Sequence, residues 1–124
     1  MLSAAAAARA GEKPVLSGKI FLQTPSGNEK PLKNAVVELR QIKQAGKIAA
    51  KTYTSNRGSF TFYGICKGEY YLRVVRRVRK QKGRQPRVYF QLQDNKKTKR
   101  SHVIIENPAK TKRMNILVTG AEVD

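Results

Sequence analysis

The sequence is poor in the side chains that build metal centres and disulfide scaffolds. Its 124 residues include one cysteine, Cys66, one histidine, His102, and no tryptophan. A single cysteine cannot form a disulfide within the chain, and a structural zinc site needs several cysteine or histidine ligands. One histidine also cannot build a multi-histidine metal site. We therefore expect neither a metal centre nor a cofactor.

Acidic residues are also scarce, with 8 Asp and Glu against 26 Lys and Arg, which gives a formal net charge of +18. Glu38, Glu69, Asp94 and Glu106 fall in separate segments, so no pair of carboxylates for glycoside hydrolysis is visible. With the lone His102 there is no spare partner for a serine, histidine and aspartate triad. These shortages favour a protein that is not an enzyme.

Long apolar segments are missing as well. No run approaches the roughly 20 apolar residues that cross a bilayer, so we expect no transmembrane segment. The opening "MLSAAAAARAGEKP" lacks the positive start and apolar core of a secretory signal. We predict a flexible tail over residues 1–13 and a single domain over residues 14–124, a length typical of one folded unit.

The positive charge is concentrated in the second half of the chain. Between Lys67 and Arg113 there are 16 basic and 3 acidic side chains, which is a net +13 of the +18. From Arg73 to Arg87 there are eight basic side chains and no acidic one. Such a field attracts polyanions, although the plain alternative is a solvated surface. The candidate polyanion-binding residues are Arg73, Arg76, Arg77, Arg79, Lys80, Lys82, Arg84, Arg87, Lys96, Lys97, Lys99 and Arg100.

A third basic cluster comprises Lys110, Lys112 and Arg113. The three clusters follow successive predicted strands, so we hypothesise that they converge at one end of the domain, although alternate loops of a sandwich lie at opposite ends. Outward tyrosines could stack on bases. In a sheet, however, tyrosines are more often partly buried.

The apolar residues alternate with a period close to two, and Gly, Pro, Asn and Ser stand at the breaks, which indicates short strands. We predict a seven- to eight-stranded antiparallel β-sandwich. The expected strands cover residues 15–24, 35–42, 48–54, 59–63, 70–78, 87–93, 102–106 and 114–119.

The alternation also predicts which side chains enter the core. The inward sets are Ala35, Val37 and Leu39, then Phe60 and Phe62, then Tyr70, Leu72 and Val74. Continuing the last set places Arg76 and Val78 on the inner line and Arg73 and Val75 outside. The strand is therefore expected to leave the core as a projecting basic ribbon. The chain is expected to return to the core in the next strand with Val88, Phe90 and Leu92. The "SNRG" stretch predicts a hairpin in which Asn56 and Gly58 take positive backbone angles.

Two stretches carry a resemblance to a known family. "PLKNAVVELR", residues 31–40, and "TYTSNRGSFTFYGICKGEYYLRVV", residues 52–75, resemble the carboxypeptidase-regulatory-like and transthyretin-like β-sandwich domains. Asn34 stands where glycine is usual and Ser55 where aspartate is usual. The resemblance implies the fold and a cell-envelope or secreted location. The matching residues are Ala35, Val37, Leu39, Thr54, Gly58, Phe60, Phe62, Ile65, Gly68, Tyr70, Leu72 and Val74.

The chain is similar in one strand to the collagen-adhesin B-type repeats, in which a glutamate assists a covalent lysine crosslink. Glu38 matches that glutamate, but Leu22 stands where the lysine would align. A leucine cannot form an amide bond, so the resemblance implies no crosslink here.

Composition, charge and resemblance together predict a non-catalytic binding or structural module whose basic hairpin and loops contact an anionic macromolecule. That partner is a nucleic acid, an anionic glycan or an acidic protein surface. The alternative is a nucleic-acid-binding protein or ribonucleoprotein component.

Overall fold

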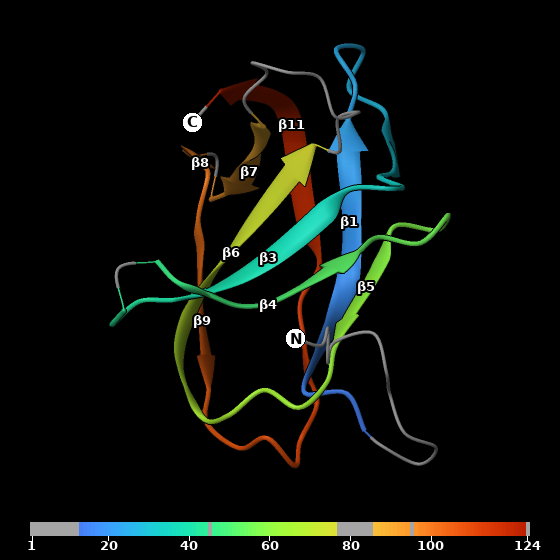
Figure 1. Ribbon diagram of the computed structural model, residues 1–124. Coiled ribbons are helices and arrows are strands. Elements are labelled where there is room, and N and C mark those ends of the chain that lie inside the picture. The colour runs from blue at the N-terminus through green and yellow to red at the C-terminus, as the bar shows by residue number, and fades with distance from the viewer. Residues whose placement is uncertain (1–12, 45, 77–85, 95, 124) are drawn as a thin grey trace.

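The computed structural model describes residues 13–44, 46–76, 86–94 and 96–123. Every regular element in this part of the chain is a strand (Figure 1). The strands are β1 (Leu16–Gln23), β2 (Glu29–Pro31), β3 (Val36–Gln41), β4 (Ile48–Tyr53), β5 (Ser59–Phe62), β6 (Gly68–Arg76), β7 (Arg87–Gln93), β8 (Lys96–Thr98), β9 (Ser101–Ile105), β10 (Lys112–Arg113) and β11 (Ile116–Val123).

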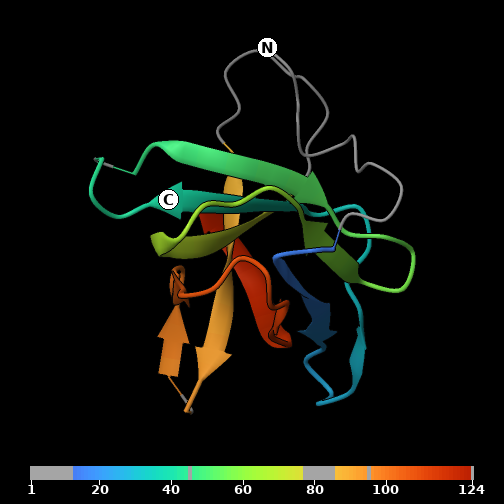
Figure 2. The same ribbon diagram turned by 90° about the horizontal axis from the view of Figure 1, so that it is seen from below.

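The strands form one curled sheet with the order β10-β1-β11-β7-β6-β3-β4. β1 belongs to both layers, because its first half pairs with β5 and β10 and its second half with β2 and β11. Seen from below, β3 and β4 lie side by side across one side of the molecule, with β1 on the other (Figure 2). The predicted all-β sandwich is confirmed.

Two details of the strand arrangement differ from the prediction. β1 runs parallel to both β10 and β11, so the sheet is mixed rather than purely antiparallel. The short strands β2, β8 and β10 raise the number of strands above eight. Strands of two or three residues leave almost no periodic signal in a sequence, which is why they were not predicted.

The core contains the side chains that the alternation placed inward. Phe60 and Phe62 are buried and meet edge to face, with ring centroids 6.1 Å apart. Around them, β3 contributes Val37 and Leu39, and β6 contributes Leu72. The apolar surface removed from water on this face is the main stabilising term of the fold.

The "SNRG" stretch forms a tight turn but not a hairpin. The Gly58 amide donates to the Ser55 carbonyl at 2.9 Å, and Gly58 has a φ of 78°. Asn56 does not take a positive φ, so only the glycine half of that prediction is confirmed. β4 pairs with β3, whereas β5 pairs with β1, so the turn carries the chain from one layer to the other.

β6 has two different neighbours along one of its edges. Its first half pairs with β9, from Gly68 to Leu72, and its end pairs with β7 at Val75 and Arg76. The two neighbours therefore separate at the middle of β6 and leave a fork. The buried amide of Gln91 fills it: Nε2 donates to the Leu72 carbonyl at 3.0 Å, and Oε1 accepts a hydrogen bond from the Ser101 hydroxyl.

This fork corrects the prediction for β7. Phe90, expected on the returning apolar line, is only half-buried and lies outside the main core cluster, while Gln91 is fully buried. Val75, expected to face outward, is buried because it lies directly opposite Val36 and Val88 on neighbouring strands. Arg76, on the expected inner line, is exposed because the core ends before it.

Some predictions fall on the undescribed parts of the chain. The tail over residues 1–13 lies there except for Lys13, and so do Val78 and the tip of the basic ribbon. Within the described ranges, no helix is long and apolar enough to cross a membrane.

Candidate anion-binding surface

The first part of the candidate site is a pair of arginines at the junction of β6 and β7. Arg76 and Arg87 are direct cross-strand partners, and both are exposed. Like charges directly opposite each other in a sheet are destabilising. Arg76 also lies near Tyr89: burial raises the pKa of the Tyr89 phenol, and the positive charge of Arg76 partly offsets that rise. The described residues of the junction therefore form an electropositive point.

The second part is a set of cations held against aromatic rings. Lys97 and Lys99 place their ammonium groups 5.9 Å and 5.2 Å from the Phe90 ring centroid. The Arg100 guanidinium lies 5.1 Å from the Tyr71 ring centroid. Each distance is within the range in which an aromatic face attracts a cation. The rings thus restrict three of the four cations predicted on this loop.

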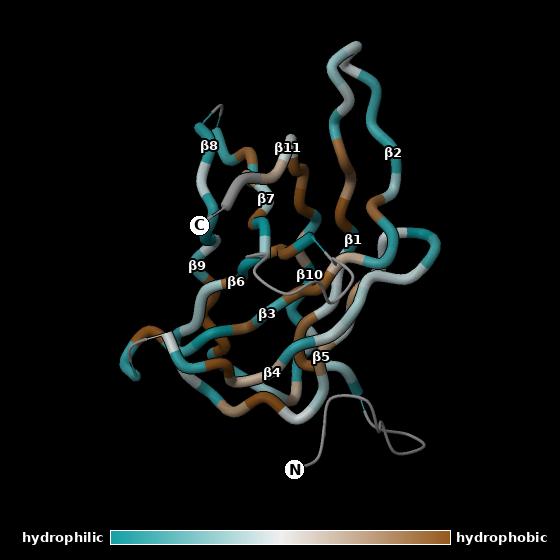
Figure 3. Tube along the Cα trace, turned by 45° about the horizontal axis from the view of Figure 1, so that its top comes forward, coloured by the Kyte–Doolittle hydropathy of each residue, from teal (hydrophilic) through white to brown (hydrophobic). Residues whose placement is uncertain are grey.

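Arg76, Arg87, Lys96, Lys97, Lys99 and Arg100 are hereafter the cationic end. They follow the length of β7: Arg76 lies opposite Arg87 at its start, and β8 pairs with its other end, from Gln91 to Gln93. The tube coloured by hydropathy shows β8 as a hydrophilic segment (Figure 3). Among the side chains that the structure describes, which do not include those of residues 122–124, no carboxylate lies within ion-pair distance of Arg76, Arg87 or Arg100.

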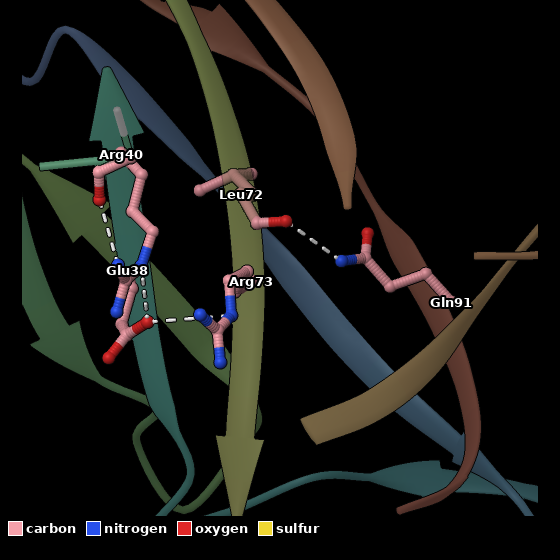
Figure 4. A network of polar contacts seen from close by, with 6 residues as sticks. Glu38, Arg40, Leu72, Arg73 and Gln91 are labelled. Carbon is pink, nitrogen blue, oxygen red and sulfur yellow. Dashed lines mark hydrogen bonds and ion pairs between the residues drawn. The ribbon is translucent and has the colours of Figure 1, made fainter. Parts of the chain in front are cut away.

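Arg73 is placed differently from the other candidates. Its side chain is 12% exposed, and its Nε lies 3.7 Å from Oε1 of Glu38 (Figure 4). The same oxygen accepts a hydrogen bond of 2.9 Å from Arg40, and this bond raises the pKa of Arg40 above its ordinary value. Arg73 is therefore engaged by a carboxylate within the sheet. Glu38 faces these arginines rather than Leu22, which packs against the core.

The other predicted candidates divide between two places. Arg77, Arg79, Lys80, Lys82 and Arg84 lie outside the described residues, so their role stays a prediction. The third basic cluster lies on and just before β10, and the segment between β9 and β11 crosses the lower end in Figure 1. That cluster does not join the cationic end, so the hypothesis that all three converge is wrong.

The aromatic rings of the site were missed by the sequence reasoning. Phe90 was assigned to an apolar line, and no ring stands within a basic cluster along the chain. The missing signal was the polar residue Gln91 between Phe90 and Leu92, because a buried glutamine moves its two neighbours to the other face of a strand.

The remaining reactive side chains do not assemble into a centre. His102 Nε2 lies 3.8 Å from Glu69 Oε1, and both side chains are about half exposed. Cys66 is exposed, and its backbone carbonyl accepts a 2.7 Å hydrogen bond from Tyr70. In the part of the chain that the structure covers, no group of three metal-binding side chains occurs.

A solved structure has the same fold at low sequence identity. A Pseudomonas aeruginosa structure described as a "putative carbohydrate binding protein" has a TM-score of 0.50 and 15% identity, and the match covers 90% of this chain and 93% of that one. An (S)-allantoin synthase has a TM-score of 0.47 and 12% identity, covering 86% of this chain and 42% of that one. At 15% identity the likeness to the Pseudomonas aeruginosa structure shows the fold alone. No curated protein matches the sequence.

A family comparison is more specific. Residues 20–107 match the SpaA prealbumin-like fold domain, which confirms the transthyretin-like part of the resemblance. The carboxypeptidase-regulatory-like part is not confirmed. Because the match covers more than half of the sequence, the chain belongs to the SpaA-type prealbumin-like fold family.

Proposed function

We propose that this protein is a non-catalytic binding or structural module whose cationic end docks onto an anionic macromolecule. The observation that carries the proposal is the cross-strand pair of Arg76 and Arg87. A like-charge pair opposes folding, and an anion that bridges the two guanidinium groups would remove that cost. Lys97, Lys99 and Arg100, on β8 and just after it, would extend the contact toward the other end of β7.

Preorganisation supports the same proposal. A flexible lysine loses side-chain entropy when it binds an anion, of the order of 1 kcal/mol for each immobilised side chain. Contact with the Phe90 and Tyr71 rings restricts these cations before binding. Family membership fits a module rather than an enzyme, and we propose a cell-envelope or secreted location on the same ground.

A nucleic-acid-binding function is the second candidate. It is favoured by the rings beside the cations, because bases stack on aromatic side chains that lie along a basic surface. Against it, the Phe90 and Tyr71 rings already carry cations on the described surface. Retention of single-stranded RNA in preference to an anionic glycan, at equal charge density and about 150 mM salt, would support this candidate.

The test compares two variants that lose the same charge at different places. The first, R76Q/R87Q/K97Q/R100Q, neutralises the cationic end. The matched control, K30Q/K51Q/R57Q/K67Q, removes four exposed positive charges from other elements.

Affinity for heparin and for poly(U) is measured by fluorescence anisotropy at about 150 mM salt. We expect the first variant to lose at least about tenfold in affinity for the true class of partner and the control to lose much less. Equal losses in both variants would show that the charge acts diffusely, and would contradict a defined site.

A further inference from the structure

β9 has an edge to which no described strand is paired. On one side its five residues pair with β6, from Gly68 to Leu72. No backbone hydrogen bond joins the other side to any residue that the structure describes. In Figure 1, β9 forms the outer boundary of the sheet on that side. Its backbone N–H and C=O groups there are available to another strand.

The sequence of β9 does not protect this edge. Natural edge strands are usually blunted by lysine or by a β-bulge. β4, the strand at the end of the sheet, has both: Lys51 is exposed on it, and its register shifts between Leu39 and Arg40 of β3. β9 reads Ser-His-Val-Ile-Ile, with no lysine and a regular register, and Ile104 on it is 41% exposed.

Both ends of β9 are cationic. Lys97, Lys99 and Arg100 precede it. At its other end lies a shallow recess of about 240 Å³, in which two lysines outnumber the single carboxylate of Glu106 beside apolar side chains. The recess is lined by Ile104, Ile105, Glu106, Asn107, Lys110, Thr111 and Lys112.

We propose that an extended protein segment, with an uncharged β-branched middle and acidic flanks, binds by adding a strand to the free edge of β9. Backbone hydrogen bonds along β9 would supply the affinity, and contact with Ile104 and the recess would supply specificity. The acidic flanks would meet the cations at the two ends. This inference rests on the proposed function for its anionic partner, and it names that partner as an acidic polypeptide.

A second copy of the chain fits this edge less well. An antiparallel self-pairing about Val103 would place Arg100 of one copy opposite Glu106 of the other, but it would also bring two basic molecules together. Each copy also carries a net charge of +18. Charge complementarity therefore favours an acidic partner over self-association.

The test uses labelled synthetic peptides and fluorescence anisotropy. The first peptide has a Thr-Val-Thr-Val-Thr middle with acidic Asp-Glu-Glu flanks. In the second, proline replaces both valines, which removes backbone donors but leaves the charge unchanged. The protein variants are Ile104→Asn on β9 and, as a matched control, Ile48→Asn on β4, where the side chain is 42% exposed.

We expect the first peptide to bind, the proline peptide to bind at least about tenfold more weakly, and I104N but not I48N to lose binding by a similar factor. Amide hydrogen exchange should slow on binding within residues 101–106. Equal binding of the two peptides would overturn strand addition. Dimerisation of the free protein that I104N abolishes would overturn it too, since the occupant would then be a second copy.

Heparin binding separates this inference from the proposed function. If heparin binds and depends on the cationic end but neither peptide uses β9, only the strand addition fails. If heparin binding does not depend on the cationic end, the proposed function fails, whatever the peptides do.

Discussion

Gln91 shows how a single buried polar residue can set the geometry of the sheet. Its amide completes the hydrogen bonding of the Leu72 carbonyl and the Ser101 hydroxyl where β7 and β9 separate. A buried polar group without a partner costs free energy comparable to a lost hydrogen bond. Gln91 therefore supplies hydrogen bonds that the separation of β7 from β9 would otherwise leave unmade.

Replacing Gln91 with alanine should lower the free energy of unfolding by about 2 kcal/mol or more, because the Leu72 carbonyl and the Ser101 hydroxyl both lose a buried partner. Chemical denaturation measures the change. Gln93→Ala, which removes one 2.9 Å hydrogen bond from an exposed residue, should cost clearly less. Similar costs for both variants would show that the fork does not depend on Gln91.

Among individual core residues, the sequence predicted the apolar side chains well and the buried polar side chains poorly. Phe60, Phe62 and Leu72 were found because alternation reports burial directly. Gln91 was not, because a glutamine is mostly exposed in proteins and only the separation of β7 from β9 gives it a partner. That separation depends on contacts between strands distant in sequence.

The end of β6 and the start of β7 form the element on which the proposed function depends. Their two paired positions differ in kind: Val75 and Val88 are buried together, whereas Arg76 and Arg87 face each other at the exposed end. The first pair contributes to stability and the second opposes it. The protein thus keeps a locally unfavourable contact at the position where we place its ligand.

Replacing Arg87 with threonine should raise the free energy of unfolding by about 0.2 to 1 kcal/mol at low salt, because it removes a like-charge cross-strand pair. The same variant should bind heparin more weakly. Denaturation and anisotropy measure the two effects, and Lys96→Thr on β8, which lies opposite Gln93, is the control for loss of one charge. A loss of stability in Arg87→Thr would show that the pair is not repulsive.

Among the elements, the longer strands were predicted to within a few residues and the pairing was not. The "SNRG" turn has the chemistry of a hairpin, yet β4 and β5 pair with strands in different layers. Turn residues indicate local backbone angles. The strand with which each strand pairs depends instead on the layer that its apolar face must cover. The basic segment over residues 77–85 lies outside the described residues, so its place in the fold remains a prediction.

For the molecule as a whole, stability should fall at alkaline pH because tyrosines are buried. Burial raises the pKa of both Tyr70 and Tyr89 above the ordinary value. A phenol whose folded pKa is raised contributes fully below its unfolded pKa of about 10, and its contribution is lost as the pH rises through the folded pKa. The decline should therefore begin near pH 10.

The double variant Tyr70→Phe/Tyr89→Phe should show a shallower alkaline decline of the denaturation midpoint than the wild type, although it starts from lower stability because the Tyr70 hydrogen bond to Cys66 is lost. Tyr53→Phe, at an exposed position, is the control and should leave the slope unchanged. Identical slopes in all three proteins would contradict a role for phenol burial.

The charge of the molecule determines how binding should respond to salt. A contact made through a few fixed cations releases a fixed number of counterions, so the logarithm of the affinity falls linearly with the logarithm of the salt concentration. Binding through a diffuse net charge also weakens as salt is added, but its affinity does not depend on which individual charges are removed. The slope of affinity against salt, and its dependence on the position of the removed charges, therefore separate a defined site from a diffuse charge.

The most direct measurement is the salt dependence of heparin affinity for the wild type, R76Q/R87Q/K97Q/R100Q and K30Q/K51Q/R57Q/K67Q. We expect a steep linear slope for the wild type, reduced by about 3 in the first variant and by less than about 1 in the second. Equal slopes in the two variants, or a wild-type slope near zero, would contradict a defined cationic site.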